Sequence, residues 1–102
     1  MIYKIDKTAT FVSWIDNLSD LRGRAKIMVR LSRLIDGNFG DCKYIGGDVS
    51  ELRVNFGPGY RVYFTKQENV LILLLCGGDK STQARDIRKA QLMSRELKER
   101  RT

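Results

Sequence analysis

A chain of 102 residues has room for one domain, and 42% hydrophobic with 30% charged residues excludes a disordered chain. Its 19 basic and 12 acidic residues give a net charge of +7, which favours a polyanionic partner, nucleic acid first. The sequence contains no histidine, which excludes Ser-His-Asp and Cys-His catalysis and the paired-histidine type of ribonuclease.

A short strand at residues 2–5 and then two helices are predicted in the first part of the chain. Apolar residues at i, i+3, i+4 and i+7 predict a helix that Thr8 or Thr10 caps. Its apolar stripe consists of Phe11, Trp14, Ile15 and Leu18. A second helix follows Asp20 and ends at Gly37, for which a left-handed conformation is expected. Its buried stripe is predicted to be Ile27, Met28, Leu31, Leu34 and Ile35.

The glycine-rich residues 37–47 are predicted to form a loop with a short extended piece at 43–45. Three strands are expected after it, at 49–56, 60–65 and 70–76. The last of these is apolar throughout, which is typical of a strand covered on both faces.

Gly77 and Gly78 are expected to break this strand before a C-terminal helix that Asp79 or Ser81 caps. The apolar positions of that helix are Ala84, Ile87, Ala90 and Leu97. Its highly charged end, residues 97–102, is expected to fray. The order β-α-α-β-β-β-α predicts a single α+β domain over residues 1–102, with an antiparallel helical hairpin packed on a mostly antiparallel sheet.

Neither a membrane segment nor a metal site is expected. The longest apolar run, 70–76, is too short to span a bilayer, and the N-terminus has no secretory hydrophobic region, so we expect a cytoplasmic protein. Cys42 and Cys76 have no CxxC spacing and are expected to be reduced structural thiols. We expect no metal and no cofactor, since no histidine is available as a ligand.

The predicted strand 60–65 contains the first candidate site. Its alternation places Arg61 and Tyr63 together on the face opposite the apolar set. Arg61 could grip an RNA phosphate with two hydrogen bonds, and Tyr63 could stack on a nucleotide. The alternative is that Arg61 pairs with a neighbouring carboxylate and Tyr63 covers part of the core.

The start of the C-terminal helix is the second candidate. Unpaired backbone N–H groups at Ser81 and Thr82 attract anions, and Lys80 adds a positive charge. The alternative is simple helix capping. A nucleotide-binding P-loop is excluded, because Asp79 stands where that motif has the glycine before its lysine.

One face of the second predicted helix is basic. The stripe consists of Arg22, Lys26, Arg30 and Arg33. Such a stripe is usually only a solvated face, and the alternative is that it helps to hold a large anionic target such as RNA.

Several motifs in order give the chain a family resemblance. They are RAKI (24–27), GNFGD (37–41), ELR (51–53), GPGYRVY (57–63) and LCGGDKSTQ (75–83). Over residues 1 to about 97 the chain resembles the HigB-like "addiction module killer protein" branch of the RelE/ParE superfamily.

The resemblance implies a RelE-like fold and the toxin of a type II toxin–antitoxin system. It also implies a neutralising helix-turn-helix antitoxin encoded by the adjacent gene. RelE-like members cleave mRNA, usually on the ribosome, whereas ParE-like members inhibit DNA gyrase without cleavage.

By position, the resemblance assigns Arg61 to the scissile phosphate, Lys80 to the leaving group and, more loosely, Arg53 to a strand where RelE has lysines. The chain lacks the C-terminal tyrosine that stacks on the nucleobase in RelE and the histidines of other relatives, so Tyr63 is the candidate for stacking.

The expected chemistry is attack by the RNA 2′-hydroxyl on its own phosphodiester, giving a 2′,3′-cyclic phosphate and a 5′-hydroxyl without a metal. Cationic groups would stabilise the transition state electrostatically. Two other functions stay open at this point: a gyrase inhibitor without nuclease activity, and a non-catalytic nucleic-acid-binding module.

Overall fold

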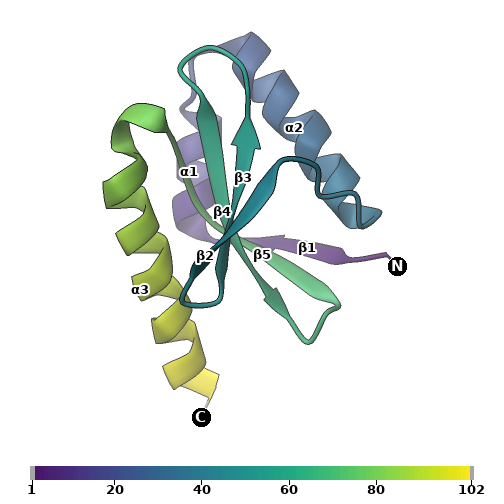
Figure 1. The fold of residues 1–102 in the computed structure, drawn as a ribbon, viewed down its shortest axis with the longest axis vertical. Helices are drawn as coiled ribbons and strands as arrows, with labels where there is room; N and C mark the ends of the chain where they lie inside the picture. Colours follow the sequence, from purple (N-terminus) through teal and green to yellow (C-terminus); the bar gives the residue numbers. More distant parts are fainter. Residues whose placement is uncertain (1, 102) are drawn as a thin grey trace.

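The computed structural model describes residues 2–101 and shows a five-stranded sheet with α1 and α2 on one face and α3 on the other (Figure 1). The strands are β1 (Lys4–Lys7), β2 (Cys42–Gly46), β3 (Val49–Val54), β4 (Tyr60–Gln67) and β5 (Leu71–Asp79). The helices are α1 (Ala9–Asp16), α2 (Leu21–Ile35), the 3₁₀ turn η1 (Lys80–Thr82) and α3 (Gln83–Arg101).

The sheet has the order β1-β5-β4-β3-β2, and β1 and β5 are its parallel pair. The other neighbouring strands are antiparallel. The prediction of an α+β fold with a mostly antiparallel sheet is therefore confirmed. The extended piece expected at 43–45 is a full strand, β2, so the order contains one strand more than predicted.

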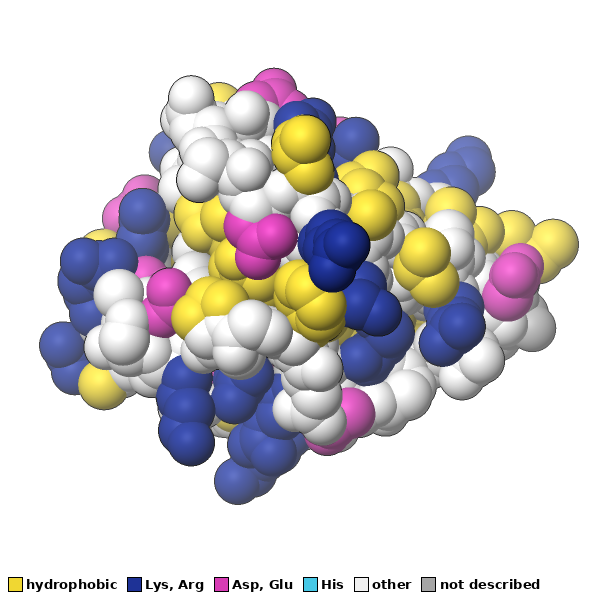
Figure 2. All heavy atoms as spheres, turned by 90° about the horizontal axis from the view of Figure 1, so that it is seen from above, with side chains coloured by type: hydrophobic (Ala, Val, Ile, Leu, Met, Phe, Trp, Pro, Cys, Tyr) yellow, Lys and Arg dark blue, Asp and Glu magenta, His cyan; other side chains and the backbone are white. Residues whose placement is uncertain are grey.

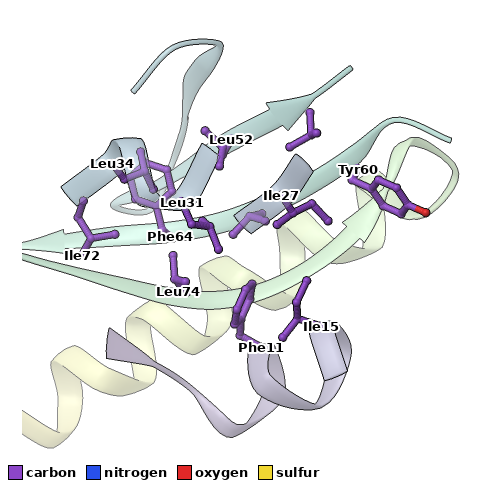
Figure 3. Packing of buried hydrophobic residues seen from close by; sticks show 12 residues of the cluster. Phe11, Ile15, Ile27, Leu31, Leu34, Leu52, Tyr60, Phe64, Ile72 and Leu74 are labelled. Atoms are coloured by element: carbon purple, nitrogen blue, oxygen red, sulfur yellow. The ribbon is translucent and has the colours of Figure 1, made fainter. Parts of the chain in front are cut away.

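The larger core lies between the sheet and the first two helices. Figure 3 shows side chains of α1 and α2 packed with those of the strands, among them Phe11, Ile27, Leu31, Phe64 and Leu74. This cluster contains the predicted face of β4 and most of the predicted helical stripes, because alternation and helical period set which side chains share a face. Met28 and Ile35, expected to be buried, are 44% and 36% exposed, since they lie at the margin of the α2 stripe.

The caps of the first two helices explain where these helices begin and end. The side chain of Thr8 accepts a hydrogen bond from the backbone N–H of Phe11 and caps α1. Of the two predicted caps, Thr8 and Thr10, the first is therefore confirmed. Gly37 has a φ of 80°, and its N–H donates to the carbonyl of Leu34, which confirms the predicted left-handed end of α2.

The start of α2 is tied to the start of β4. Asp20 caps the helix by accepting from the N–H of Gly23, and it also accepts from the Tyr60 hydroxyl at 2.6 Å. A Cβ on Gly23 would lie 2.4 Å from the Tyr60 ring, so the close approach requires glycine. Burial and the bond to Asp20 raise the pKa of Tyr60 to about 12.

The smaller core lies under α3 and contains Val49, Tyr63, Leu73, Leu75, Cys76 and Ala90. β5 supplies side chains to both cores, which confirms that this apolar strand is covered on both faces. Ala84, expected on the buried face of α3, is exposed, whereas Asp86 on that helix is 3% exposed. The helix continues to Arg101, and Thr102 lies outside the described residues, so the fraying expected at this end stays a prediction.

The two glycines expected to break β5 are part of the strand. A Cβ on Gly77 would lie 2.3 Å from the Trp14 ring, and one on Gly78 would lie 1.9 Å from the Asp86 carboxylate. These residues are therefore glycine because α1 and α3 approach the strand backbone closely from its two sides. Among residues 2–101, no helix has the length and apolar character needed to cross a membrane.

Candidate functional site

Three basic residues from three neighbouring elements meet at one end of the sheet. Arg53 of β3 stands directly opposite Arg61 of β4, and Gly78 of β5 stands opposite Arg61 on its other side. Lys80 follows two residues after Gly78. A Cβ placed on Gly59 would lie 3.4 Å from Arg61 Nη1 and 3.5 Å from the Lys80 Cβ, so these two side chains flank the same spot. The fold thus brings together the three residues predicted to act on the phosphate.

A buried carboxylate that the sequence interpretation missed lies beside these cations. Glu51 is fully buried and accepts hydrogen bonds from Arg53 Nε at 2.9 Å, Gln83 Nε2 at 2.8 Å and the Tyr63 hydroxyl at 3.1 Å. Its Oε1 is also 3.9 Å from Arg61 Nε. Strand alternation could have identified it, because Glu51 shares the face of Arg53 and stands opposite Tyr63.

The charge states of this group follow from these contacts. Burial alone would raise the pKa of Glu51, but the hydrogen bonds from Arg53, Gln83 and Tyr63 outweigh it and lower the pKa below the usual value. Burial, together with the nearby charge of Glu51, raises the pKa of Tyr63 far above its usual value. Glu51 is therefore ionised at neutral pH and Tyr63 is neutral, and the carboxylate orients Arg53 through its hydrogen bond.

Arg61 is mostly buried, with 9% of its surface exposed. Its Nη1 donates to the carbonyls of Gly59 at 3.1 Å and Tyr60 at 3.2 Å, whereas its buried Nε has no hydrogen-bond partner. No hydrogen bond within residues 2–101 uses Nη2. The sequence left open that Arg61 pairs with a neighbouring carboxylate. The structure shows this arrangement, and the carboxylate is that of Glu51.

The predicted stacking role of Tyr63 is wrong for this conformation. Tyr63 does share the face of Arg61, but it is fully buried in the core under α3, with its hydroxyl bonded to Glu51. Alternation showed which residues share a face but not that a helix covers this one. No nucleobase can reach the ring.

The hydroxyl groups at the start of the C-terminal helix are used by its cap. Asp79 accepts from the Ser81 N–H at 2.8 Å and the Ser81 hydroxyl at 2.5 Å, and the Thr82 hydroxyl donates to Asp86 at 2.5 Å. Hydrogen bonding from Ser81 lowers the pKa of Asp79. Lys80 is exposed, and its ammonium makes no ion pair within the described part of the chain. Of the three residues at this helix start that were predicted to bind an anion, Lys80 is the one whose side chain is exposed and has no partner among the described residues.

The basic stripe of α2 is divided between structural and solvent-exposed side chains. Arg30 Nη1 donates to the Arg53 carbonyl, and its Nη2 donates to the Phe39 carbonyl at 3.0 Å, so Arg30 connects α2 to β3. The Lys26 ammonium lies 5.1 Å from the centre of the Phe56 ring. The other members, Arg22 and Arg33, are exposed. A groove of about 340 Å³ runs beside this stripe. Figure 2 shows basic side chains spread over this end of the molecule, with hydrophobic and acidic side chains between them.

Comparison with known proteins identifies the fold and the family. The solved structure of a double mutant of the E. coli toxin RelE in the free state matches with a TM-score of 0.72 and 16% identity, over 90% of this chain and 96% of that one. The chain therefore has the predicted RelE-like fold. An uncharacterized protein of Haemophilus influenzae is 52% identical over 97 residues, which are 95% of this chain and 98% of that protein. The chain belongs to the same family as this protein. No family model matches the sequence.

Proposed function

We propose that this protein is the toxin of a type II toxin–antitoxin module of the HigB-like branch, and that it cleaves mRNA in the cytoplasm, on the ribosome. The observation that carries the proposal is the convergence of Arg53, Arg61 and Lys80 at one end of a RelE-like sheet. The solved structure with this fold belongs to a protein named as a toxin. A cationic group of this kind suits the stabilisation of a phosphorane-like transition state.

Each cation has a distinct part in the proposed reaction. The Lys80 ammonium is exposed and would neutralise or protonate the departing 5′-oxygen. Arg61 Nη2 is the unengaged donor that would bond a non-bridging phosphate oxygen. The Arg53 side chain is 33% exposed and adds positive charge at the rim, while Glu51 holds both arginines in place. The attacking 2′-hydroxyl belongs to the RNA, and the ribosome would supply near-attack geometry.

The primary test is Lys80→Ala, because Lys80 is exposed and makes no contact that the fold needs. Lys4→Ala, an exposed lysine in the edge strand β1, is the matched control. Growth arrest and primer extension on cellular mRNA would be measured after induction. Loss of one preorganised cation should lower cleavage on the order of 10²-fold or more, with the control unchanged. Full-rate cleavage by a folded Lys80→Ala protein would remove Lys80 from the site.

Arg61 needs a conservative variant, since its truncation would leave buried Glu51 with one cation fewer. Arg61→Lys keeps the charge but loses the planar pair of donors, so it should fold and cleave more slowly. If Lys80→Ala and Arg61→Lys act on one phosphate, the double variant should lose less than the two single effects combined.

A supercoiling assay with purified gyrase separates the nuclease from a gyrase inhibitor. Wild-type protein that arrests growth with intact mRNA and blocks supercoiling is a gyrase inhibitor, and the nuclease proposal is then wrong. RNA binding without growth arrest would indicate a non-catalytic nucleic-acid-binding module.

The proposed partner is a helix-turn-helix antitoxin encoded by the adjacent gene. The net charge of +7 suits an acidic neutralising segment, and α2 exposes Met28 and Val29 at 44% and 49% as apolar contacts. Co-expression with the adjacent open reading frame should restore growth and yield a complex. If no neighbouring gene suppresses toxicity, the toxin–antitoxin proposal fails.

A further inference from the structure

A polar groove of about 520 Å³ lies between α1 and α3, beside the candidate site. β1 pairs with β5 at Leu71–Leu74, so the last part of β5 has no neighbouring strand on that edge. Cys76 and Gly77 of this open edge line the groove, with α1 on one side and α3 on the other. The chain passes from the end of β5 through the turn η1 (Lys80–Thr82) into α3 (Figure 1).

Two basic side chains of α3 line the groove. Arg85 and Lys89 are one helical turn apart, about 6 Å along the axis, and both are exposed. Arg85 Nε lies 3.5 Å from Asp86 Oδ1, which orients the guanidinium, while Asp86 is 3% exposed and also bonded to Thr82. Lys89 makes no ion pair with any described residue. The groove therefore presents two cations, and its one carboxylate is buried and already engaged.

The wall on the α1 side offers donors that the fold does not use. Trp14 lies against the backbone of Gly77, where any Cβ would come within 2.3 Å of the ring. Its indole N–H is accessible to solvent and has no hydrogen-bond acceptor among residues 2–101. Thr10 and Ser13 add hydroxyl groups one turn apart on the same wall. Cations, hydroxyls and an aromatic ring are the groups that bind single-stranded RNA.

The groove and the cation cluster lie at the same end of β5. Gly77 lines it, and the next residue, Gly78, stands opposite Arg61 in the sheet, with Lys80 two positions further on. Gly77 faces α1 and Gly78 faces α3, so an RNA strand whose scissile phosphate lies at Arg61 would pass Lys80, at the end of β5, to reach the groove. Resting on the proposed function, we infer that the groove between α1 and α3 binds the RNA strand flanking the cleavage point, with Arg85 and Lys89 on its phosphates and Trp14 on a nucleotide.

The test uses binding rather than cleavage. The probe is a fluorescein-labelled single-stranded RNA with 2′-O-methyl groups, which cannot undergo 2′-hydroxyl attack, and fluorescence anisotropy is measured over a series of salt concentrations. The variants are Lys89→Ala alone and with Arg85→Ala. Arg88→Ala is the matched control, because this neighbouring cation lies on the side of α3 that lines a different groove.

Each phosphate contact contributes about 0.7 to the log–log salt slope on a single strand, so the double variant should lose about 1.4 from the slope. Its affinity at physiological salt should fall about tenfold or more, whereas the control should lose less than about twofold. Trp14→Phe should weaken binding without changing the slope, because it removes the indole N–H but no charge. Lys89→Ala keeps the test valid if Arg85→Ala, which unpairs Asp86, proves unstable.

Two results overturn the inference. In the first, the double variant has the same salt slope and RNA affinity as the Arg88→Ala control. This result rules out the groove even if the Lys80→Ala experiment supports the nuclease. The other is a double variant that keeps its RNA affinity but no longer co-purifies with the antitoxin, which makes the groove a protein-binding surface. Conversely, a lowered slope together with intact cleavage by Lys80→Ala supports the groove and removes only the catalytic assignment.

Discussion

Replacing Glu51 by alanine tests whether this carboxylate holds the candidate site together. Glu51 is fully buried, with three hydrogen bonds of 2.8 to 3.1 Å and a second arginine at 3.9 Å. Removing one partner of a buried ion pair costs about 3–5 kcal/mol, because the remaining charge stays buried without compensation. We expect the lower end, about 3 kcal/mol, since the Arg53 side chain is 33% exposed and can turn to water.

For a chain of this length a loss of that size lowers Tm by roughly 12–24 °C, which circular dichroism measures directly. The cause is tested with a double-mutant cycle against Arg61→Met, which keeps the aliphatic stem and removes the charge. The Glu51→Ala, Arg61→Met protein should be more stable than the sum of the single effects by about 1 kcal/mol or more. A loss below about 1 kcal/mol for Glu51→Ala, or an additive cycle, would refute a structural role of this charge group.

Three further predictions concern pH, backbone approach and thiol reactivity. Folding lowers the pKa of Glu51, so the stabilisation from its carboxylate is present above the unfolded pKa and is lost as pH falls through the folded pKa. Below about pH 4.5, urea unfolding should therefore show a smaller loss of stability with falling pH for Glu51→Gln than for the wild type. Gly77→Ala drives a Cβ into the Trp14 ring and should cost about 1–3 kcal/mol in urea unfolding, and an unchanged midpoint would contradict the close approach. Burial raises the pKa of Cys76 to about 12, so in a thiol-labelling assay at pH 8 it should react only on unfolding, after the half-buried Cys42.

Sequence periodicity predicted the elements that bury a regular stripe. The α1 stripe around Phe11, the alternation of β4 and the apolar run of β5 all led to the observed cores, since burial on a helix or strand repeats with a fixed period. The short strand β2 was missed as a strand. Its Tyr44 is 64% exposed, and its pairing with β3 has a register shift between Tyr44 and Gly46, so its residues carry little alternation.

The candidate site was only half predictable, because the face of a strand residue does not reveal what covers that face. Arg61 and Tyr63 were correctly placed on one face, but α3 buries the tyrosine fully, and only 9% of the arginine surface is exposed. Glu51 was missed because a carboxylate in an alternating strand looks like a solvated residue. Its burial depends on partners from β4 and α3, of which Gln83 lies 32 residues away in the chain.

The charge balance of the cluster bears on how such a site could work without histidine. Arg53, Arg61 and Lys80 bring three positive charges, whereas Glu51 and Asp79 beside them bring two negative ones. A cluster with so small a net charge attracts RNA only weakly from a distance. Its carboxylates, however, hold the donors in position before the phosphate arrives, and such preorganised donors are what stabilise developing charge. Under the proposed function, affinity would come from the exposed cations around it, on α2 and in the α1–α3 groove. The proposal thereby gives binding and catalysis to different residues, and the groove variants should change the salt dependence of binding while Lys80→Ala changes the rate.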